Sequence, residues 1–116
     1  MKPRILLVDD EEASRYSICK ALENAGFDVL AAADHRAALE EINSDRAIDL
    51  LLTDVVMPNS VNGFALARMA RMRRPKLKVI YITGYDLPTE EADGTVLRKP
   101  IEHDDVIAEV RRTLAA

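Results

Sequence analysis

The sequence predicts an α/β fold in which helices cover both faces of a parallel β-sheet. Five short apolar runs alternate along the chain with segments of helical periodicity. The runs are hydrophobic at consecutive positions, which is typical of strands buried on both faces. Repeated strand–helix alternation indicates a parallel sheet, and right-handed crossovers place helices on both sides of it. We therefore expect one doubly wound α/β domain over residues 1–116.

The five predicted strands are residues 5–8, 29–32, 50–52, 79–82 and 96–97. The two predicted helices of the first half each have a recognisable boundary residue. The first helix spans residues 11–25 and stops at Gly26, because glycine tolerates the left-handed conformation that often follows a helix. Asp34 is the predicted N-cap of a second helix that continues to about Ile42.

The second half holds two more predicted helices and one irregular interval. The third helix begins at Gly63, and the last begins at Asp104 or Asp105. Residues 84–94 separate the last two strands and include two glycines and a proline. This interval is too short for a full helix with two loops, so we expect at most one helical turn near Thr89–Asp93.

The composition excludes several classes of protein. A net charge of −4 argues against nucleic-acid binding driven by overall charge. The single cysteine, Cys19, rules out an internal disulfide framework and a cysteine-rich zinc site, and it fits a reduced compartment. No apolar run approaches the ~18 residues of a membrane span, so we expect a cytoplasmic protein without membrane contact. No glycine belongs to a dinucleotide fingerprint or a P-loop, so phosphate chemistry would need another kind of site.

Polar residues with chemical potential follow four of the predicted strands. They are Asp9 and Asp10 after the first, Asp54 after the third, Thr83 after the fourth and Lys99 after the fifth. Ligands of open parallel sheets bind at the carboxyl ends of the strands, where these side chains converge if the first strand neighbours the third. Three close carboxylates repel one another, and a hard divalent cation such as Mg²⁺ would remove that repulsion.

A phosphoryl group is the ligand that suits this set of side chains. A metal ion, the Thr83 hydroxyl and the Lys99 ammonium together form a clamp for an anion with three terminal oxygens. A carboxylate in such a clamp can act as a nucleophile and become an aspartyl phosphate. Taken singly, each of these residues is more often a helix cap, a turn residue or a solvated charge. Their shared position at one edge of the sheet favours the site.

The order and spacing of these motifs resemble the receiver, or phosphoacceptor, domain of bacterial two-component response regulators. The resemblance covers essentially the whole chain and rests on four segments: Ile5–Glu11, Leu52–Pro58 followed by Gly63, Ile82–Gly84, and Lys99–Pro100. It implies a flavodoxin-like, doubly wound five-stranded parallel sheet with the strand order 2-1-3-4-5.

The resemblance also implies a role for each site residue. The expected Mg²⁺ ligands are the carboxylates of Asp9, Asp10 and Asp54 and the backbone carbonyl of Val56. Asp54 is the expected phosphoacceptor, Thr83 would hydrogen-bond one phosphoryl oxygen, and Lys99 would pair with another. The peptide bond between Lys99 and Pro100 is expected to be cis.

In signalling terms, the resemblance implies a phosphorelay module. A histidine kinase or a histidine phosphotransfer protein would donate the phosphoryl group, and an unidentified downstream protein would bind differently afterwards. The domain would catalyse only its own phosphorylation and dephosphorylation, so it is not expected to be an enzyme in the usual sense. A monomer or weak dimer that binds no nucleic acid is expected.

Three features depart from the usual receiver pattern. Val96 stands where the family usually has the Tyr or Phe that turns inward on phosphorylation, so the usual switch is not available. The short interval 84–94 leaves the family's fourth helix shortened or absent. The loop from Pro58 to Gly63 is one residue longer than usual. This combination resembles receivers of hybrid sensor kinases and some single-domain receivers.

Two other functions remain as alternatives. A degenerate receiver could act as a phosphorylation-independent interaction module, which Val96 favours and the intact set of chemical residues opposes. An aspartate-dependent phosphohydrolase of related fold would carry a second aspartate two residues after its nucleophile, where Glu11 stands here, and would need a cap domain. The basic stretch from Arg68 to Lys78 is interpreted as a solvated helix face, and His35 and His103 as surface residues.

Overall fold

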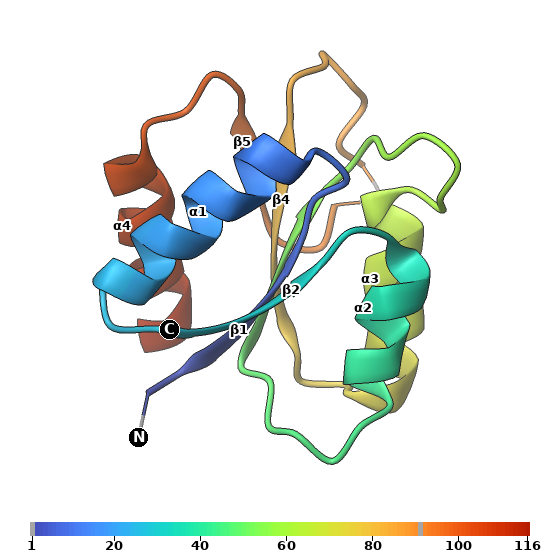
Figure 1. The fold of residues 1–116 in the computed structure, drawn as a ribbon. Coiled ribbons are helices and arrows are strands. Elements are labelled where there is room, and N and C mark those ends of the chain that lie inside the picture. Colours follow the sequence, from blue (N-terminus) through green and yellow to red (C-terminus); the bar gives the residue numbers. More distant parts are fainter. Residues whose placement is uncertain (1, 91) are drawn as a thin grey trace.

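A five-stranded parallel sheet organises the molecule, with helices on both faces (Figure 1). The computed structural model describes residues 2–90 and 92–116, and its strand order is β2-β1-β3-β4-β5. The strands are β1 (Arg4–Val8), β2 (Asp28–Ala32), β3 (Leu50–Asp54), β4 (Lys78–Thr83) and β5 (Thr95–Arg98). The helices are α1 (Glu12–Asn24), α2 (His35–Ile42), α3 (Gly63–Arg73) and α4 (His103–Ala115). The predicted fold and strand order are therefore confirmed.

The central strands owe their continuous apolar sequences to burial on both faces. All residues of β3 are buried, as are the last four of β1. The parallel register places Val8 beside Thr53. Asp9 and Asp54 each come one residue later, so the register brings these two carboxylates to the same level at the carboxyl edge.

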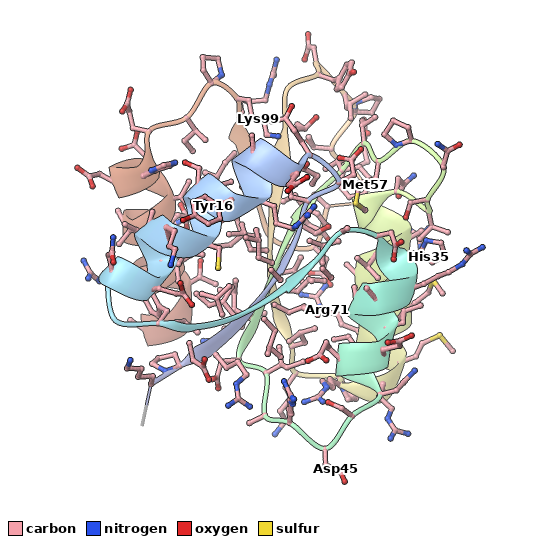
Figure 2. The ribbon with its side chains drawn as sticks, viewed as in Figure 1. Tyr16, His35, Asp45, Met57, Arg71 and Lys99 are labelled. Carbon is pink, nitrogen blue, oxygen red and sulfur yellow. The ribbon has the colours of Figure 1, made fainter. Side chains whose placement is uncertain are left out.

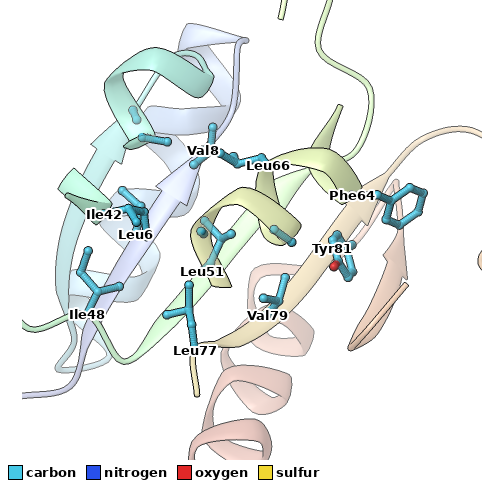
Figure 3. Close-up of a cluster of buried hydrophobic side chains, with 14 of the residues drawn as sticks. Leu6, Val8, Ile42, Ile48, Leu51, Phe64, Leu66, Leu77, Val79 and Tyr81 are labelled. Atoms are coloured by element: carbon cyan, nitrogen blue, oxygen red, sulfur yellow. The ribbon is translucent and has the colours of Figure 1, made fainter. Parts of the chain in front are cut away.

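Two hydrophobic cores hold the layers together. One lies between the sheet and the pair α2 and α3, and the other between the sheet and the pair α1 and α4. Figure 3 shows the first, in which the rings of Phe64 and Tyr81 meet edge to face with centroids 4.9 Å apart. Each burial removes apolar surface from water at a gain of roughly 25 cal/mol per Å². Among the described residues, no helix is long and apolar enough to cross a membrane.

The helix boundaries follow local capping chemistry, with one correction. The Asp34 side chain accepts a hydrogen bond from the Ala37 amide at 2.9 Å, which confirms the predicted N-cap of α2. The predicted start of the last helix at Asp104 or Asp105 is wrong, because α4 begins one or two residues earlier, at His103. Asp104 and Asp105 lie in its first turn, where carboxylates interact favourably with the helix dipole without serving as the cap.

The connection between β4 and β5, residues 84–94, is here named the crossover. Its described residues, 84–90 and 92–94, contain no helix. A single turn is present, in which the Ala92 amide donates to the Thr89 carbonyl at 3.0 Å. The described residues therefore confirm the prediction that the family's fourth helix is shortened or absent. Position 91, inside the predicted turn, lies outside the described residues.

The interpretation of the basic stretch as a solvated helix face holds only in part, because Arg74 and Lys78 are half-buried. Arg74 donates from Nε to the carbonyl of Ile42 at 3.0 Å, at the end of α2. Lys78 donates from Nζ to the carbonyl of Thr113 at 2.9 Å, at the end of α4. Cations at helix C-termini satisfy carbonyls that have no intrahelical partner and oppose the helix dipole. These side chains therefore tie the layers together at the edge opposite the predicted site.

The two histidines differ in their surroundings. His103 is exposed, as expected, and its Nε2 lies 3.0 Å from the Ser17 hydroxyl. His35 is half-buried, and its Nδ1 lies 2.7 Å from the Ser60 hydroxyl. His35 therefore lies at the surface but is not isolated, because it connects the lengthened β3–α3 loop to the start of α2.

Candidate functional site

The predicted site residues meet at the carboxyl edge of the sheet, around a cavity of about 260 Å³. Its walls are formed by Asp10, Glu11, Asp54, Val56, Pro58, Ile82, Thr83, Gly84, Tyr85 and Lys99. Figure 2 labels Lys99 and Met57 at this end of the molecule. Residues far apart in sequence thus surround one small polar space, as the convergence of the strand ends predicts.

Three carboxylates form the acidic part of the site. Asp9, Asp10 and Asp54 each offer an oxygen, and these oxygens lie within 4.8 Å of one another. Asp9 and Asp54 are buried, whereas Asp10 is exposed. Oxygen ligands drawn from carboxylates, with several positions left for water, are what Mg²⁺ prefers.

The buried carboxylate of Asp9 is only half satisfied. The Glu11 amide donates to Asp9 Oδ1 at 2.9 Å. Within the described part of the chain, Asp9 Oδ2 is buried and has no hydrogen-bond partner. An unpaired buried acceptor costs about 1–3 kcal/mol, and a cation would remove that cost. The orphaned oxygen and the clustered carboxylates together fit a divalent metal ion.

Burial shifts the ionisation of Asp54. Loss of solvation, followed by the neighbouring Asp9, raises the pKa of Asp54 to about 7, while Lys99 acts in the opposite direction. A carboxylate must be ionised to act as a nucleophile or as a metal ligand, so positive charge nearby would favour either role near neutral pH. Lys99 supplies part of that charge, since its Nζ lies 3.3 Å from Asp54 Oδ1.

Backbone contacts fix the position of Asp54. The Val55 amide donates to the Ile82 carbonyl at 2.9 Å, which extends the β3–β4 pairing past the strand end. The first residue of α3, Gly63, passes so close that a Cβ there would lie 2.3 Å from the Asp54 carbonyl oxygen. Position 63 therefore requires glycine, because the backbones of α3 and β3 leave no room there for a Cβ. Its amide donates to the Val55 carbonyl at 2.8 Å, holding the loop that carries Val56.

Thr83 and Lys99 complete the opposite wall of the cavity. The Thr83 hydroxyl is the acceptor of a 3.1 Å bond from the Tyr85 amide, so its proton can be donated to an anion. The Lys99 amide donates to the Thr83 carbonyl at 2.8 Å, which keeps the two residues adjacent. The bond between Lys99 and Pro100 is cis, as predicted.

The structure places two further residues, Val96 and Tyr85, relative to the cavity. Val96 is half-buried, pairs with Tyr81 across β4 and β5, and packs on the core away from the cavity. Tyr85 lines the cavity with its side chain 60% exposed, although the sequence assigned it no role. Its position two residues after Thr83, at the same strand end, could have indicated that it lies beside the site. The amide of Glu11, which orients Asp9, could not be singled out from side-chain chemistry.

Comparison of the sequence with known proteins points to one family. Residues 5–111 match the response regulator receiver domain. The chain is 38% identical to the response regulator receiver protein CpdR of Brucella abortus (strain 2308), over 97% of this chain and 98% of that protein. It is 34% identical to the response regulator MprA of Mycolicibacterium vanbaalenii over 98% of its own length, which spans 51% of that protein.

Solved structures give the same result. A response regulator receiver protein from Sinorhizobium medicae WSM419 is similar with a TM-score of 0.90 and 31% identity, covering 99% of this chain and 96% of that one. The receiver domain of the hybrid histidine kinase CckA is similar with a TM-score of 0.83 and 36% identity, covering 96% and 98%. The fold, the order of the motifs and these matches agree: the chain belongs to the response regulator receiver domain family.

Proposed function

We propose that this domain is a Mg²⁺-dependent phosphoacceptor and that Asp54 receives the phosphoryl group. The observation that carries the proposal is the grouping of three carboxylates within 4.8 Å, with the Lys99 ammonium 3.3 Å from Asp54. Asp9, Asp10, Asp54 and the Val56 carbonyl would hold the cation. When bound, Mg²⁺ would neutralise charge on the carboxylate and on the incoming phosphoryl oxygens.

The chain's own residues define the transfer step. An Asp54 carboxylate oxygen attacks the phosphorus of a phosphohistidine, and the phosphorus–nitrogen bond breaks. The electron pair of that bond stays on the departing imidazole nitrogen, which takes a proton from solvent. Lys99 and the Thr83 hydroxyl stabilise two phosphoryl oxygens during this step. Water then releases phosphate from the acyl phosphate, so the domain would catalyse only its own phosphorylation and dephosphorylation.

The donor is a histidine kinase or a histidine phosphotransfer protein in this proposal. The similarity to a receiver domain of a hybrid histidine kinase supports this class of partner. Output follows from a shift in population between two conformations that bind an unidentified downstream protein differently. We place this exchange in the cytoplasm, with the domain acting as a monomer or weak dimer and without nucleic acid.

Beryllofluoride, which imitates a phosphoryl group on aspartate, tests the proposal. Amide NMR spectra of the protein with Mg²⁺, before and after adding beryllofluoride, should show shifts at Asp54, Thr83, Gly84 and Lys99. Asp54→Asn should show none of them, and neither should the wild-type protein in EDTA. Unchanged spectra of the wild-type protein in Mg²⁺ would contradict the proposal.

A phosphorylation-independent interaction module is the second candidate, and Val96 is the observation that favours it. With valine at this position, the aromatic ring that usually turns inward is missing. Cells that carry Asp54→Asn distinguish the candidates, because signalling at the wild-type level would support the independent module. Loss of signalling, with the variant still folded, would support phosphorylation.

A further inference from the structure

Arg71 makes an unusual set of contacts with the crossover. It belongs to α3 and is labelled in Figure 2. Its side chain is 22% exposed. Its Nε donates to the Leu77 carbonyl at 3.0 Å, just before β4. Its Nη1 donates to the Asp93 carboxylate at 2.5 Å and its Nη2 to the Asp93 carbonyl at 3.0 Å. We name these three hydrogen bonds the Arg71 clamp.

Neighbouring groups reinforce the clamp at the same end of the crossover. Tyr81 lines the same small cavity as Arg71 and Asp93, and its ring packs edge to face on Phe64. Gly94 follows with φ +159, and a Cβ there would lie 2.2 Å from the Val79 carbonyl oxygen. The chain thus enters β5 in close contact with β4, which leaves this end little room to move.

The other end of the crossover is held much more weakly. The Tyr85 amide donates to the Thr83 hydroxyl, which is the group proposed to bind a phosphoryl oxygen. The second tie joins Arg98 and Asp86 at 3.4 Å, between side chains that are 56% and 95% exposed. Exposed ion pairs of this kind contribute little to stability. If the Thr83 side chain moves toward a phosphoryl oxygen, the Tyr85 contact lengthens, and the few restraints on residues 84–86 weaken.

We propose that Arg71 is a positioning residue that anchors the β5 end of the crossover and confines phosphorylation-dependent movement to residues 84–86. This device would take the place of the helix that usually stabilises the connection. The arginine is suited to it because its planar fork bonds a carboxylate and two carbonyls at once. The inference rests on the proposed function for the phosphorylation step, while the clamp itself can be tested without phosphorylation.

Hydrogen exchange of Arg71→Gln in the ligand-free protein tests the clamp. We expect the amides of residues 92–96 to exchange about tenfold faster than in wild type, since hydrogen bonds to a charged group are lost. The matched control is Arg73→Gln on the same helix. Arg73 donates one hydrogen bond, 3.4 Å long, to the Asn43 carbonyl and does not contact the crossover through any described hydrogen bond. Unchanged exchange at 92–96, or equal acceleration at the core amides of Leu6 and Leu51, would overturn the clamp.

Beryllofluoride with Mg²⁺ then tests the confinement. In wild type we expect altered exchange at residues 84–86 and unaltered exchange at 92–96; in Arg71→Gln the alteration should extend through 92–96. Equal changes at both ends in wild type, or confinement to 84–86 in the variant, would overturn the proposal. No response at Thr83 in wild type would overturn the proposed function, and the ligand-free comparison would still decide whether Arg71 anchors the crossover.

Discussion

Asp54 is buried, and its proposed role as phosphoacceptor requires that its carboxylate be ionised. Burial and Asp9 make its ionisation unfavourable, and Lys99 compensates only in part. The sequence indicated Asp54 as the acceptor because it follows a buried strand within a recognisable motif. It did not indicate the raised pKa or the orphaned oxygen of Asp9, because both depend on side-chain packing that a linear pattern does not describe.

The raised pKa of Asp54 predicts how stability depends on pH. The pKa rises from 3.8 to about 7 on folding, so the folded state holds the proton more tightly between these values. The free energy of unfolding should therefore fall as pH rises through this window in EDTA. Asp54→Asn has no charge to bury and should be more stable than wild type at pH 8 by up to about 4 kcal/mol.

Urea unfolding at pH 5 and pH 8 measures this difference, with exposed Asp45→Asn as the control. The advantage of Asp54→Asn should be small at pH 5 and large at pH 8. An advantage that is equal at both pH values would show that Asp54 ionises normally.

Asp9 allows a second prediction at the residue scale. Any ion that binds only the folded state stabilises it by mass action, by about 2.7 kcal/mol at a hundred times the dissociation constant. Mg²⁺ should therefore raise the melting temperature of the wild-type protein, and Asp9→Asn should lose most of this effect because it removes a buried carboxylate of the proposed metal site. Calorimetry with and without Mg²⁺ measures it. An equal rise in both proteins would place the ion elsewhere.

At the scale of elements, strand and helix identities followed from sequence patterns, but some boundaries did not. Asp34 was identifiable as a cap because its carboxylate is well suited to accept a hydrogen bond from a backbone amide in the first turn. The sequence did not distinguish whether Asp104 and Asp105 cap the last helix or lie in its first turn, because acidic residues are favoured at both places. The anchoring roles of Arg74 and Lys78 depend on helix ends that lie close only in the folded chain.

The close approach of α3 to β3 predicts a specific sensitivity at Gly63. Gly63→Ala would force a Cβ against the Asp54 carbonyl, so we expect a loss of about 1–3 kcal/mol in the free energy of unfolding. Gly84→Ala is the control, because its nearest neighbour would be Lys99 Cβ at 3.8 Å. Urea titrations compare the two. Similar losses in both would show that close packing at Gly63 is not the cause.

The N-cap of α2 gives a smaller expected effect. Asp34→Ala removes the acceptor of the Ala37 amide and should lower the free energy of unfolding by about 1 kcal/mol. Glu40→Ala, an exposed position on the same helix, should change it much less. Chemical denaturation of both variants provides the comparison, and equal losses would assign the effect to α2 as a whole.

At the scale of the molecule, the alternation of elements was enough to predict a parallel sheet, whereas the strand order came from the resemblance to receivers. Given the order β2-β1-β3-β4-β5, the residues that follow the strands are expected to converge, because parallel strands end at the same edge of the sheet. The missing helix was predictable from the length of the interval between Thr83 and Thr95. The clamp that anchors this interval was not, since Arg71 and Asp93 meet only through tertiary structure.

The most direct test is chemical identification of the phosphorylated residue. The protein would be incubated with acetyl phosphate, reduced with borohydride to convert an aspartyl phosphate into homoserine, and digested for mass spectrometry. We predict homoserine at position 54 in Mg²⁺ and unmodified Asp54 in EDTA. Homoserine at another aspartate, or unmodified protein in Mg²⁺, would contradict the assignment of Asp54 as the phosphoacceptor.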